Sequence, residues 1–316
     1  MSIKISTTFF LIFGIITTII SFQFIEIMNS SIGAFFKNSL SKRIVDKRPI
    51  ILWGHPRSLS SAFERAFRQR SREFYVLHEP FCQEFTERKQ QLKCNYLNST
   101  IEPLFFSTLN NIFKPYYYKN DQSKPLRVFI KDISTCVIRS SIQSIENIKK
   151  MRHTFLIRNP KKSVKSLYKA CLETDKIYKK YLNQTKNWFK TISPGLMNLK
   201  KHFDLIKNVT NEKIVLVDAD DLEREPKKIL RKYCEMIGIE FKNDMLEWKV
   251  ENVQWGTWRG FINNSWLKNA EQSTGFGKII KKEEKEEQIV YPQSVYDTII
   301  ENIPHYEYLY EYRIKI

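Results

Sequence analysis

Short apolar runs recur along the chain from residue 49 onward, and each of them ends in polar or charged residues. Five runs have the length and composition of strands: Pro49–Trp53, Phe74–Leu77, Arg127–Ile130, His153–Ile157 and Ile214–Val217. Helical periodicity separates them, most clearly over residues 140–149, 160–171 and 225–237. Strands that are apolar throughout and alternate with helices predict an α/β fold with a parallel sheet flanked by helices on both faces.

Charged side chains stand directly after several of the predicted strands. His78 and Glu79 follow the second strand, Lys131 follows the third and Arg158 follows the fourth. The carboxyl ends of parallel strands meet at one edge of a sheet, where open α/β sheets bind their ligands. The sequence therefore predicts the functional site at this edge.

The stretch after the first strand has features of a phosphate-binding loop. A frame of eight residues begins at Gly54 and ends on the hydroxyl of Ser61, between a predicted strand and a predicted helix. Leu59 and Ser60 replace the second glycine and the lysine of the usual frame. A helix N-terminus with free N–H groups suits an anion. The missing lysine disfavours a magnesium-dependent kinase or nucleoside triphosphatase.

The run 56–61, which reads PRSLSS, resembles the 5′-phosphosulfate loop of P-loop sulfotransferases. That family uses 3′-phosphoadenosine 5′-phosphosulfate (PAPS) as sulfate donor, and it usually has Gly where this chain has Leu59. The resemblance implies that Arg57, Ser58, Ser60 and Ser61 bind the phosphosulfate end of the nucleotide. From the residues alone, an ordinary helix start capped by Ser58 is the alternative.

A second motif follows the fourth strand about 100 residues later. Arg158 precedes Asn159 and Pro160, which are a favourable N-cap and a favourable first helical residue, and Ser166 comes eight residues after Arg158. Sulfotransferases bind the 3′-phosphate of PAPS with an Arg and a Ser at this spacing. The resemblance therefore implies that Arg158 and Ser166 bind the 3′-phosphate. A surface arginine and a helical serine without a ligand are the alternative.

The resemblance covers roughly residues 49–280. Residues 217–241 are similar to the family's segment after the acceptor region. Trp255, Trp258 and residues 273–277 are similar to its late loop over the nucleotide. Together these matches imply a P-loop-type fold, PAPS as sulfate donor and no metal ion.

Sulfuryl transfer requires a cation at the leaving oxygen and a base for the acceptor proton. Arg57 is the candidate cation, and it would act electrostatically because it does not readily lose its proton. Lys131 matches a lysine that the cytosolic branch of the family has near the transferred group. That branch has its catalytic histidine two residues later, where this chain has Ile133.

Three side chains are candidates for the missing base. Glu79 matches a carboxylate that other branches of the family use, and it is the leading candidate. His78 stands beside it, although in an extended chain the two would point to opposite faces. Asp132 is the third candidate. A structural ion pair of Glu79 with Lys131 or Arg57 is the alternative to catalysis.

The N-terminal segment Ile5–Ile25 is uncharged and long enough to cross a bilayer, which predicts a transmembrane signal anchor. The sequence then divides into an anchor (1–25), a basic stem (26–48) and a sulfotransferase-like domain (49–316). Five glycosylation sequons favour a Golgi-lumenal domain, at Asn29, Asn98, Asn183, Asn208 and Asn263. Charges beside the anchor leave its orientation open.

Composition adds little to this picture. The net charge of +18 predicts attraction to polyanions, but no nucleic-acid-binding signature accompanies it, so no nucleic-acid partner is expected. Five scattered cysteines without a CxxC pair do not suggest a zinc site, and the metal prediction is none. The expected partners are the nucleotide donor, an unidentified acceptor and the membrane. A non-catalytic nucleotide-binding relative on the same fold remains the alternative function.

Overall fold

The computed structural model describes residues 46, 48–82, 127–135, 149–183, 187–253, 255, 266–279 and 289–316. Apart from Asp46, these residues belong to one compact unit, Lys47–Ile316. The predicted helix over 140–149, apart from residue 149, and the sequons at Asn29, Asn98 and Asn263 lie outside the described residues.

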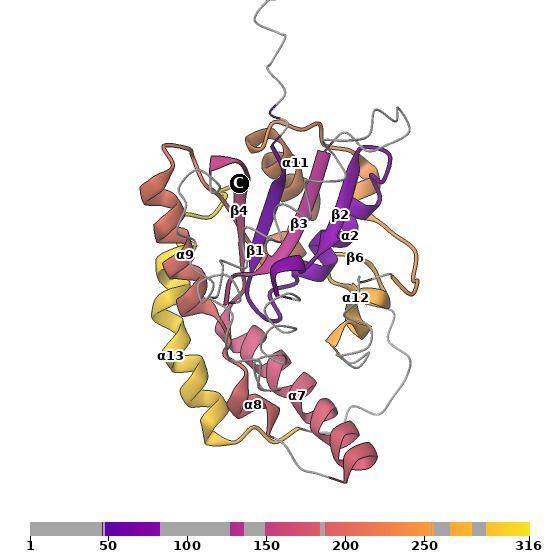
Figure 1. Ribbon diagram of the computed structural model, residues 1–316, viewed down its shortest axis with the longest axis vertical. Helices are drawn as coiled ribbons and strands as arrows, with labels where there is room; N and C mark the ends of the chain where they lie inside the picture. The colour runs from indigo at the N-terminus through magenta and orange to yellow at the C-terminus, as the bar shows by residue number, and fades with distance from the viewer. Residues whose placement is uncertain are drawn as a thin grey trace, which may run out of the picture. The chain divides into compact units, whose positions relative to one another are not determined.

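A parallel sheet of five strands forms the centre of this unit (Figure 1). Its strand order is β2-β3-β1-β4-β5, and every neighbouring pair is parallel. The strands are β1 (Ile50–Gly54), β2 (Phe74–His78), β3 (Arg127–Ile133), β4 (Arg152–Ile157) and β5 (Val215–Asp218). All five predicted strands are confirmed within a few residues, because continuous apolar runs bounded by polar residues fit buried parallel strands.

Helices cover both faces of the sheet, as the strand composition predicts. Helices α2 (Ser60–Arg68) and α11 (Pro226–Met236) pack on one face, where Phe63, Phe67 and Tyr233 lie in the same core cluster as Ile50 and Phe129. Helices α9 (Leu196–Val209) and α13 (Gln293–Tyr310) pack on the other face, alongside each other in Figure 1. The result is a three-layer α/β structure.

The remaining elements lie around this sandwich. Helix α7 (Pro160–Leu182) follows β4 and runs beyond the carboxyl edge of the sheet (Figure 1). The others are α8 (Trp188–Thr191), α10 (Ala219–Arg224), a 3₁₀ helix (Asn243–Leu246), α12 (Lys268–Glu271) and the antiparallel pair β6 (Ser273–Gly275) and β7 (Lys278–Ile279).

The strand order fixes where a ligand can bind. From β1 the chain passes to β2 and β3 on one side of the sheet and then to β4 and β5 on the other. The connections therefore diverge at the carboxyl end of β1, which is the topological switch point. The loop that begins at His55 occupies this position.

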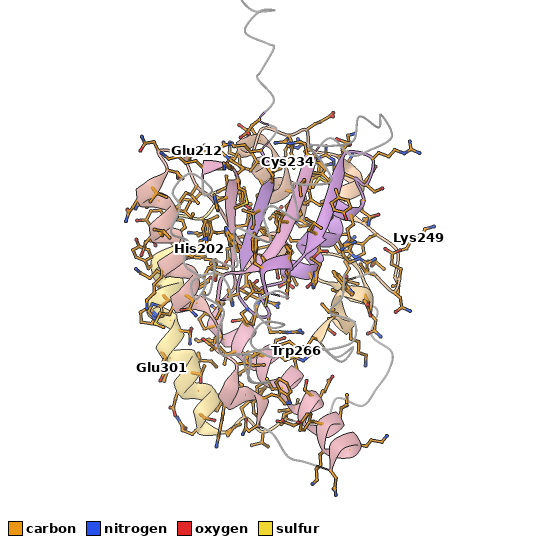
Figure 2. All side chains as sticks on the ribbon, viewed as in Figure 1. His202, Glu212, Cys234, Lys249, Trp266 and Glu301 are labelled. Atoms are coloured by element: carbon orange, nitrogen blue, oxygen red, sulfur yellow. The ribbon has the colours of Figure 1, made fainter. Side chains whose placement is uncertain are left out.

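One polar group is buried in the core on the α9 face. His202 points from α9 toward the sheet (Figure 2), with its ring centroid 4.5 Å from that of Trp53. Both ring nitrogens of His202 are buried and have no hydrogen-bond partner within the described ranges. Burial and then His153 hold the pKa of His202 well below its usual range. His202 is therefore an uncharged member of the core.

The structure does not support the predicted membrane anchor. Within the described ranges, no helix has both the length and the apolar character that a bilayer crossing needs. The two longest described helices fall short because α7 carries many lysines and α13 contains Pro304 and several acidic residues. Residues 5–25 lie outside the described residues. On this finding we withdraw the anchor helix in the predicted fold class, the membrane partner and the single-pass Golgi location.

Candidate functional site

The loop between β1 and α2 has the backbone geometry of an anion-binding turn. Arg57 and Leu59 both adopt left-handed conformations, with φ of 65° and 73°. Such turns direct successive N–H groups toward one point. No side chain caps the start of α2, so the N–H groups of its first turn have no partner from a cap. Ser58 is fully buried, and its hydroxyl has no hydrogen-bond partner among the described residues.

Gly54 is required for this close packing. A Cβ atom at this position would lie 2.9 Å from the Ser58 hydroxyl and 3.2 Å from the Ser60 Cβ. The loop therefore folds back over the end of β1, with Ser60 buried and Ser61 partly exposed in the first turn of α2. All four predicted loop residues, Arg57 included, lie within this turn.

The two predicted nucleotide motifs contact each other. Arg57 Nε donates a hydrogen bond of 3.0 Å to the Ser166 hydroxyl on α7, 109 residues away. Its NH1 group donates to the Trp266 carbonyl at 2.5 Å, and the Trp266 indole donates to Thr174 on α7. Figure 2 shows Trp266 beside α7. The sequence assigned Arg57 and Ser166 to opposite ends of the nucleotide, but the structure brings them together.

Arg158 lies at the start of α7, and the predicted cap is confirmed there. Asn159 caps the helix by accepting a hydrogen bond of 2.9 Å from the Lys161 N–H. The Arg158 NH2 group lies 3.2 Å from both carboxylate oxygens of Glu223. Its Nε atom is buried, lies 3.9 Å from Asp220 Oδ1 and makes no hydrogen bond with any residue that the structure describes. The guanidinium is therefore held by Glu223 but keeps one donor unused.

Two partly buried arginines face each other across this region. Burial, followed by the nearby charge of Arg158, lowers the pKa of Arg57 to about 10. Arg57 is still cationic at neutral pH. Glu223 offsets the charge of Arg158, and a bound anion would offset that of Arg57. The unused donors on Ser58 and Arg158 fit such an anion, and a phosphorylated ligand matches this donor set.

His55 links the two motifs and was not predicted from the sequence. The side chain is fully buried, and its Nε2 atom accepts a hydrogen bond of 3.1 Å from the Arg158 backbone N–H. Burial lowers the pKa of His55 to about 3, so the ring is neutral and can accept this bond. Neither motif marks the position, and its only sequence signal is a polar residue directly after a buried strand.

A second group of charged residues surrounds the carboxyl ends of β2 and β3. Glu79 pairs with Lys131 Nζ, and the Glu79 N–H donates to the Lys131 carbonyl at 2.7 Å. His78 Nδ1 lies 2.5 Å from Glu64 Oε2, and Arg68 pairs with the other oxygen of the same carboxylate. Three of these residues were predicted. Glu64 and Arg68, on α2, were not.

The expected separation of His78 and Glu79 is wrong. Glu79 has a φ of 47°, which ends the alternation of an extended strand. As a result His78 Nε2 lies 3.9 Å from Glu79 Oε1, and both side chains face the same cluster. The Trp255 ring covers His78 at a centroid distance of 4.8 Å.

Ionisation differs among the carboxyl groups of this cluster. Burial alone would raise the pKa of Glu64, but His78, Arg68 and Lys131 outweigh it and lower the pKa to about 2. Burial is likewise outweighed at Glu79, whose pKa is lowered by Lys131 and then His78. Burial and then Glu79 raise the pKa of Asp132 well above its usual range. Glu64 and Glu79 are thus carboxylates at neutral pH.

Asp132 has a structural role in the same region. One of its oxygens accepts the Ile133 N–H and the other accepts the Phe81 N–H, both at 2.7 Å. The side chain is fully buried. Asp132 therefore holds the turn after β2 against β3.

The late segment is in the core as well as near the site. Phe276 packs against Phe63 and Trp248. A Cβ atom at Gly277 would lie 3.8 Å from the side chain of Glu223, which holds Arg158. In the part of the chain that the structure describes, no group of three or more side chains could hold a metal ion.

Comparison with known proteins supports the predicted resemblance. The family model of the sulfotransferase domain matches residues 207–288. The predicted resemblance to P-loop sulfotransferases is confirmed by this match. The matched segment includes β5, α10, α11, Trp255 and the β6–β7 pair.

Two curated relatives from Arabidopsis thaliana are similar to this chain. Branched-chain-amino-acid aminotransferase-like protein 1 is 33% identical over 98 residues, which are 30% of this chain and 16% of the relative. Branched-chain-amino-acid aminotransferase-like protein 2 is 26% identical over 266 residues, which are 81% of this chain and 40% of the relative. The chain thus spans less than half the length of each relative.

Among solved structures, a mouse sulfotransferase, SULT7A1, complexed with PAP is similar to this chain. The TM-score is 0.40 and the sequence identity is 13%, with 85% of this chain and 91% of that chain covered.

Proposed function

We infer that this chain transfers a sulfuryl group from PAPS to a hydroxyl or amine of an unidentified acceptor, which is a glycan, a lipid or a small molecule. The observation that carries this inference is the hydrogen bond of 3.0 Å between Arg57 and Ser166. It joins two sequence motifs that sulfotransferases use for the two ends of one nucleotide. The domain responsible is assigned to residues 49–316.

The residues at the end of β1 provide the phosphosulfate site in this proposal. The N–H groups at the start of α2 and the hydroxyls of Ser58, Ser60 and Ser61 would hold the oxygens of the 5′-phosphosulfate. Arg57 adds a charge at the bridging oxygen that becomes the leaving group. No metal ion is needed, since the guanidinium and the helix N-terminus supply the positive charge.

The residues at the end of β4 provide the 3′-phosphate site. Arg158 has an unused Nε donor, and Ser166 lies one hydrogen bond from Arg57. A 3′-phosphate distinguishes PAPS from ATP, so these two residues would set the nucleotide preference. Because Arg57 contacts Ser166, it belongs to both phosphate sites in this proposal.

PAPS would supply an activated sulfuryl group, and the protein would position it and stabilise charge. Lys131 lies beside the transferred group in this assignment and balances the charge of Glu79. Glu79, His78 and Asp132 are the sequence candidates for the base. Glu79 pairs with Lys131, His78 contacts Glu64, and Asp132 accepts two backbone N–H groups.

The test compares nucleotide binding and transfer. Calorimetric titration should detect 3′-phosphoadenosine 5′-phosphate (PAP) binding without magnesium and much weaker binding of ATP with magnesium. Radiolabelled PAPS is then offered with a phenol, a primary alcohol, an amino sugar and a primary amine. Binding of PAP without transfer to any acceptor would favour a non-catalytic nucleotide-binding relative. Preference for ATP with magnesium would favour a kinase or nucleoside triphosphatase and contradict the proposal.

A further inference from the structure

Glu64 is a fully buried carboxylate at the centre of the second cluster. It lies on α2, one turn after the phosphate-binding loop, and contacts His78 at the end of β2. The side chain of His78 is itself almost fully buried, with 3% exposed. A buried carboxylate that holds a buried histidine beside a nucleotide site has the arrangement of a general base and its orienting group.

We propose that His78 takes the proton from the acceptor and that Glu64 positions His78 for this step. The proposal rests on the proposed sulfuryl transfer and names its base. His78 is the catalytic residue here, and Glu64 is a positioning residue that acts through it.

The contact with Glu64 fixes which nitrogen of His78 can accept a proton. An ionised carboxylate only accepts hydrogen bonds, and Arg68, which pairs with the other oxygen of Glu64, favours the ionised form of this carboxyl group. The hydrogen at the 2.5 Å contact therefore belongs to Nδ1. In the neutral ring Nε2 then carries the lone pair. Glu79 Oε1 lies 3.9 Å from this nitrogen, beyond hydrogen-bond distance.

The other two candidates for the base are occupied in different ways. Glu79 is paired with Lys131, and the low pKa that results makes it a weak proton acceptor. Asp132 uses both oxygens to accept backbone N–H groups. Of the three, His78 alone combines an orienting partner with a nitrogen that makes no hydrogen bond within the described residues.

The charged groups around His78 come from three elements. Glu64 and Arg68 lie on α2, Glu79 follows β2 and Lys131 lies on β3, while the Trp255 ring covers one face of the imidazole. The two carboxylates offset the two cations. A proton that arrives at Nε2 makes an imidazolium between Glu64 and Glu79, and both carboxylates stabilise it.

In the proposed sulfuryl transfer, the acceptor oxygen forms a bond to sulfur, and the bond between sulfur and the bridging oxygen breaks. The electron pair of that bond stays on the 5′-phosphate oxygen, so PAP leaves. The acceptor proton moves to His78 Nε2 and is later released to water.

Kinetic variants test the proposal with PAPS as donor. The acceptors are water, measured as PAP release, and each hydroxyl that supports transfer in the screen above. His78→Gln should lower kcat at least 100-fold with KM for PAPS within twofold. Glu64→Gln should lower kcat about 10-fold, because Gln can still accept the Nδ1 hydrogen but lacks the charge. The double variant should be no slower than His78→Gln, because Glu64 acts through His78.

A matched control is Glu73→Gln. Glu73 is a paired carboxylate near the other end of β2, where it contacts Arg70 and Lys242. The kcat of the Glu73→Gln variant should stay within twofold of that of the parent. Additive losses in the double variant, or a kcat for His78→Gln within threefold of the parent, would overturn the proposal.

A measurement on the unmodified protein keeps the proposal testable if a variant does not fold. Long-range ¹⁵N–¹H spectra of the five histidines should show the His78 proton on Nδ1, with the signal assigned by through-bond correlation of the imidazole to the backbone of His78. A proton on Nε2 of the neutral ring would refute the positioning role. Failure of PAP to bind would instead contradict the proposed function, whereas normal PAP binding with a wrong tautomer contradicts this inference alone.

Discussion

Charged side chains have different partners in two regions at the carboxyl edge of the sheet. At the end of β1 and β4, Arg57 contacts a hydroxyl and a carbonyl, which are neutral, and Ser58 and Arg158 keep unused donors. At the end of β2 and β3, both Glu64 and Glu79 contact cations. In the first region Arg158 pairs with Glu223, but Arg57 has no carboxylate within ion-pair distance among the described residues, so its charge is available for a ligand. In the second region each of the two carboxylates already has a cation.

This difference separates binding from chemistry. An anion that enters the first region gains hydrogen bonds and relieves the repulsion between Arg57 and Arg158. The second region gains little from an anion, but its ordered carboxylates and imidazole can move a proton. Variants in the two regions test how independent nucleotide binding and proton transfer are.

The largest effect is expected for Arg158→Ala. Loss of a charge-assisted hydrogen-bond pair to the 3′-phosphate should weaken PAP binding by about 2–4 kcal/mol. The loss should disappear with 5′-adenylate, which lacks that phosphate. Calorimetric titration measures both ligands, with Lys161→Ala, an exposed cation on the same helix, as control. Equal losses for the two ligands would indicate a folding role for Arg158 and remove it from the 3′-phosphate site.

A slightly smaller effect is expected for Arg57→Ala, and it should differ in kind. Because Arg57 contacts Ser166, the variant should weaken PAP by about 1.5–3 kcal/mol and 5′-adenylate by a smaller but measurable amount. The sequence alone suggested that Arg57 would be insensitive to the 3′-phosphate. Identical losses for both ligands would support that earlier expectation and contradict the shared site.

Comparison of the two regions also shows what the sequence could predict. The residues of the first region follow two motifs of fixed spacing, so the sequence alone could nominate Arg57, Arg158 and Ser166 as candidates. Apolar strand runs likewise predicted the parallel sheet, since burial on both faces leaves a plain composition signal. These are local patterns, and local patterns are readable in one sequence.

The second region depends on contacts that no local pattern records. Glu64 reaches His78 only because α2 packs beside β2, and Glu79 faces the same side because its φ is 47°. His55 was missed for the same reason, since its partner is the N–H of Arg158, 103 residues away. The N-terminal apolar segment gave a strong local signal, but no helix that could span a membrane is present in the described ranges.

His55 offers a test of the link between the two nucleotide motifs. Its folded pKa of about 3 lies below the unfolded value of about 6.5, so the unfolded state binds the extra proton. The stability that this group contributes is complete above pH 6.5 and is lost as the pH falls toward 3. Between pH 7 and pH 5 the parent should lose about 2 kcal/mol of unfolding free energy through His55.

Urea unfolding at the two pH values measures this loss. In His55→Gln the difference between pH 7 and pH 5 should be smaller by about 2 kcal/mol than in the parent. His305→Gln, at a partly exposed position on α13, is the control and should keep the parent's difference. An unchanged pH difference in His55→Gln would mean that the ring is protonated when buried, and the neutral link to Arg158 would be wrong.

The smallest effect concerns Leu59, at the position where the sulfotransferase loop that this run resembles usually has glycine. Its φ of 73° is unfavourable for a residue with a Cβ atom, while its side chain packs partly against the core on the α2 face. Leu59→Ala keeps the unfavourable backbone and loses the packing, whereas Leu59→Gly loses the packing but relaxes the backbone. In most positions glycine is less stable than alanine by about 0.5–1 kcal/mol. Here the order should reverse, with Leu59→Gly more stable than Leu59→Ala by about 1 kcal/mol in urea unfolding.

If PAP binding is equal in both variants while their stabilities differ, the left-handed turn is a property of the fold. If Leu59→Ala is the more stable variant, residue 59 does not adopt a left-handed conformation. That result would contradict the anion-binding turn at the end of β1.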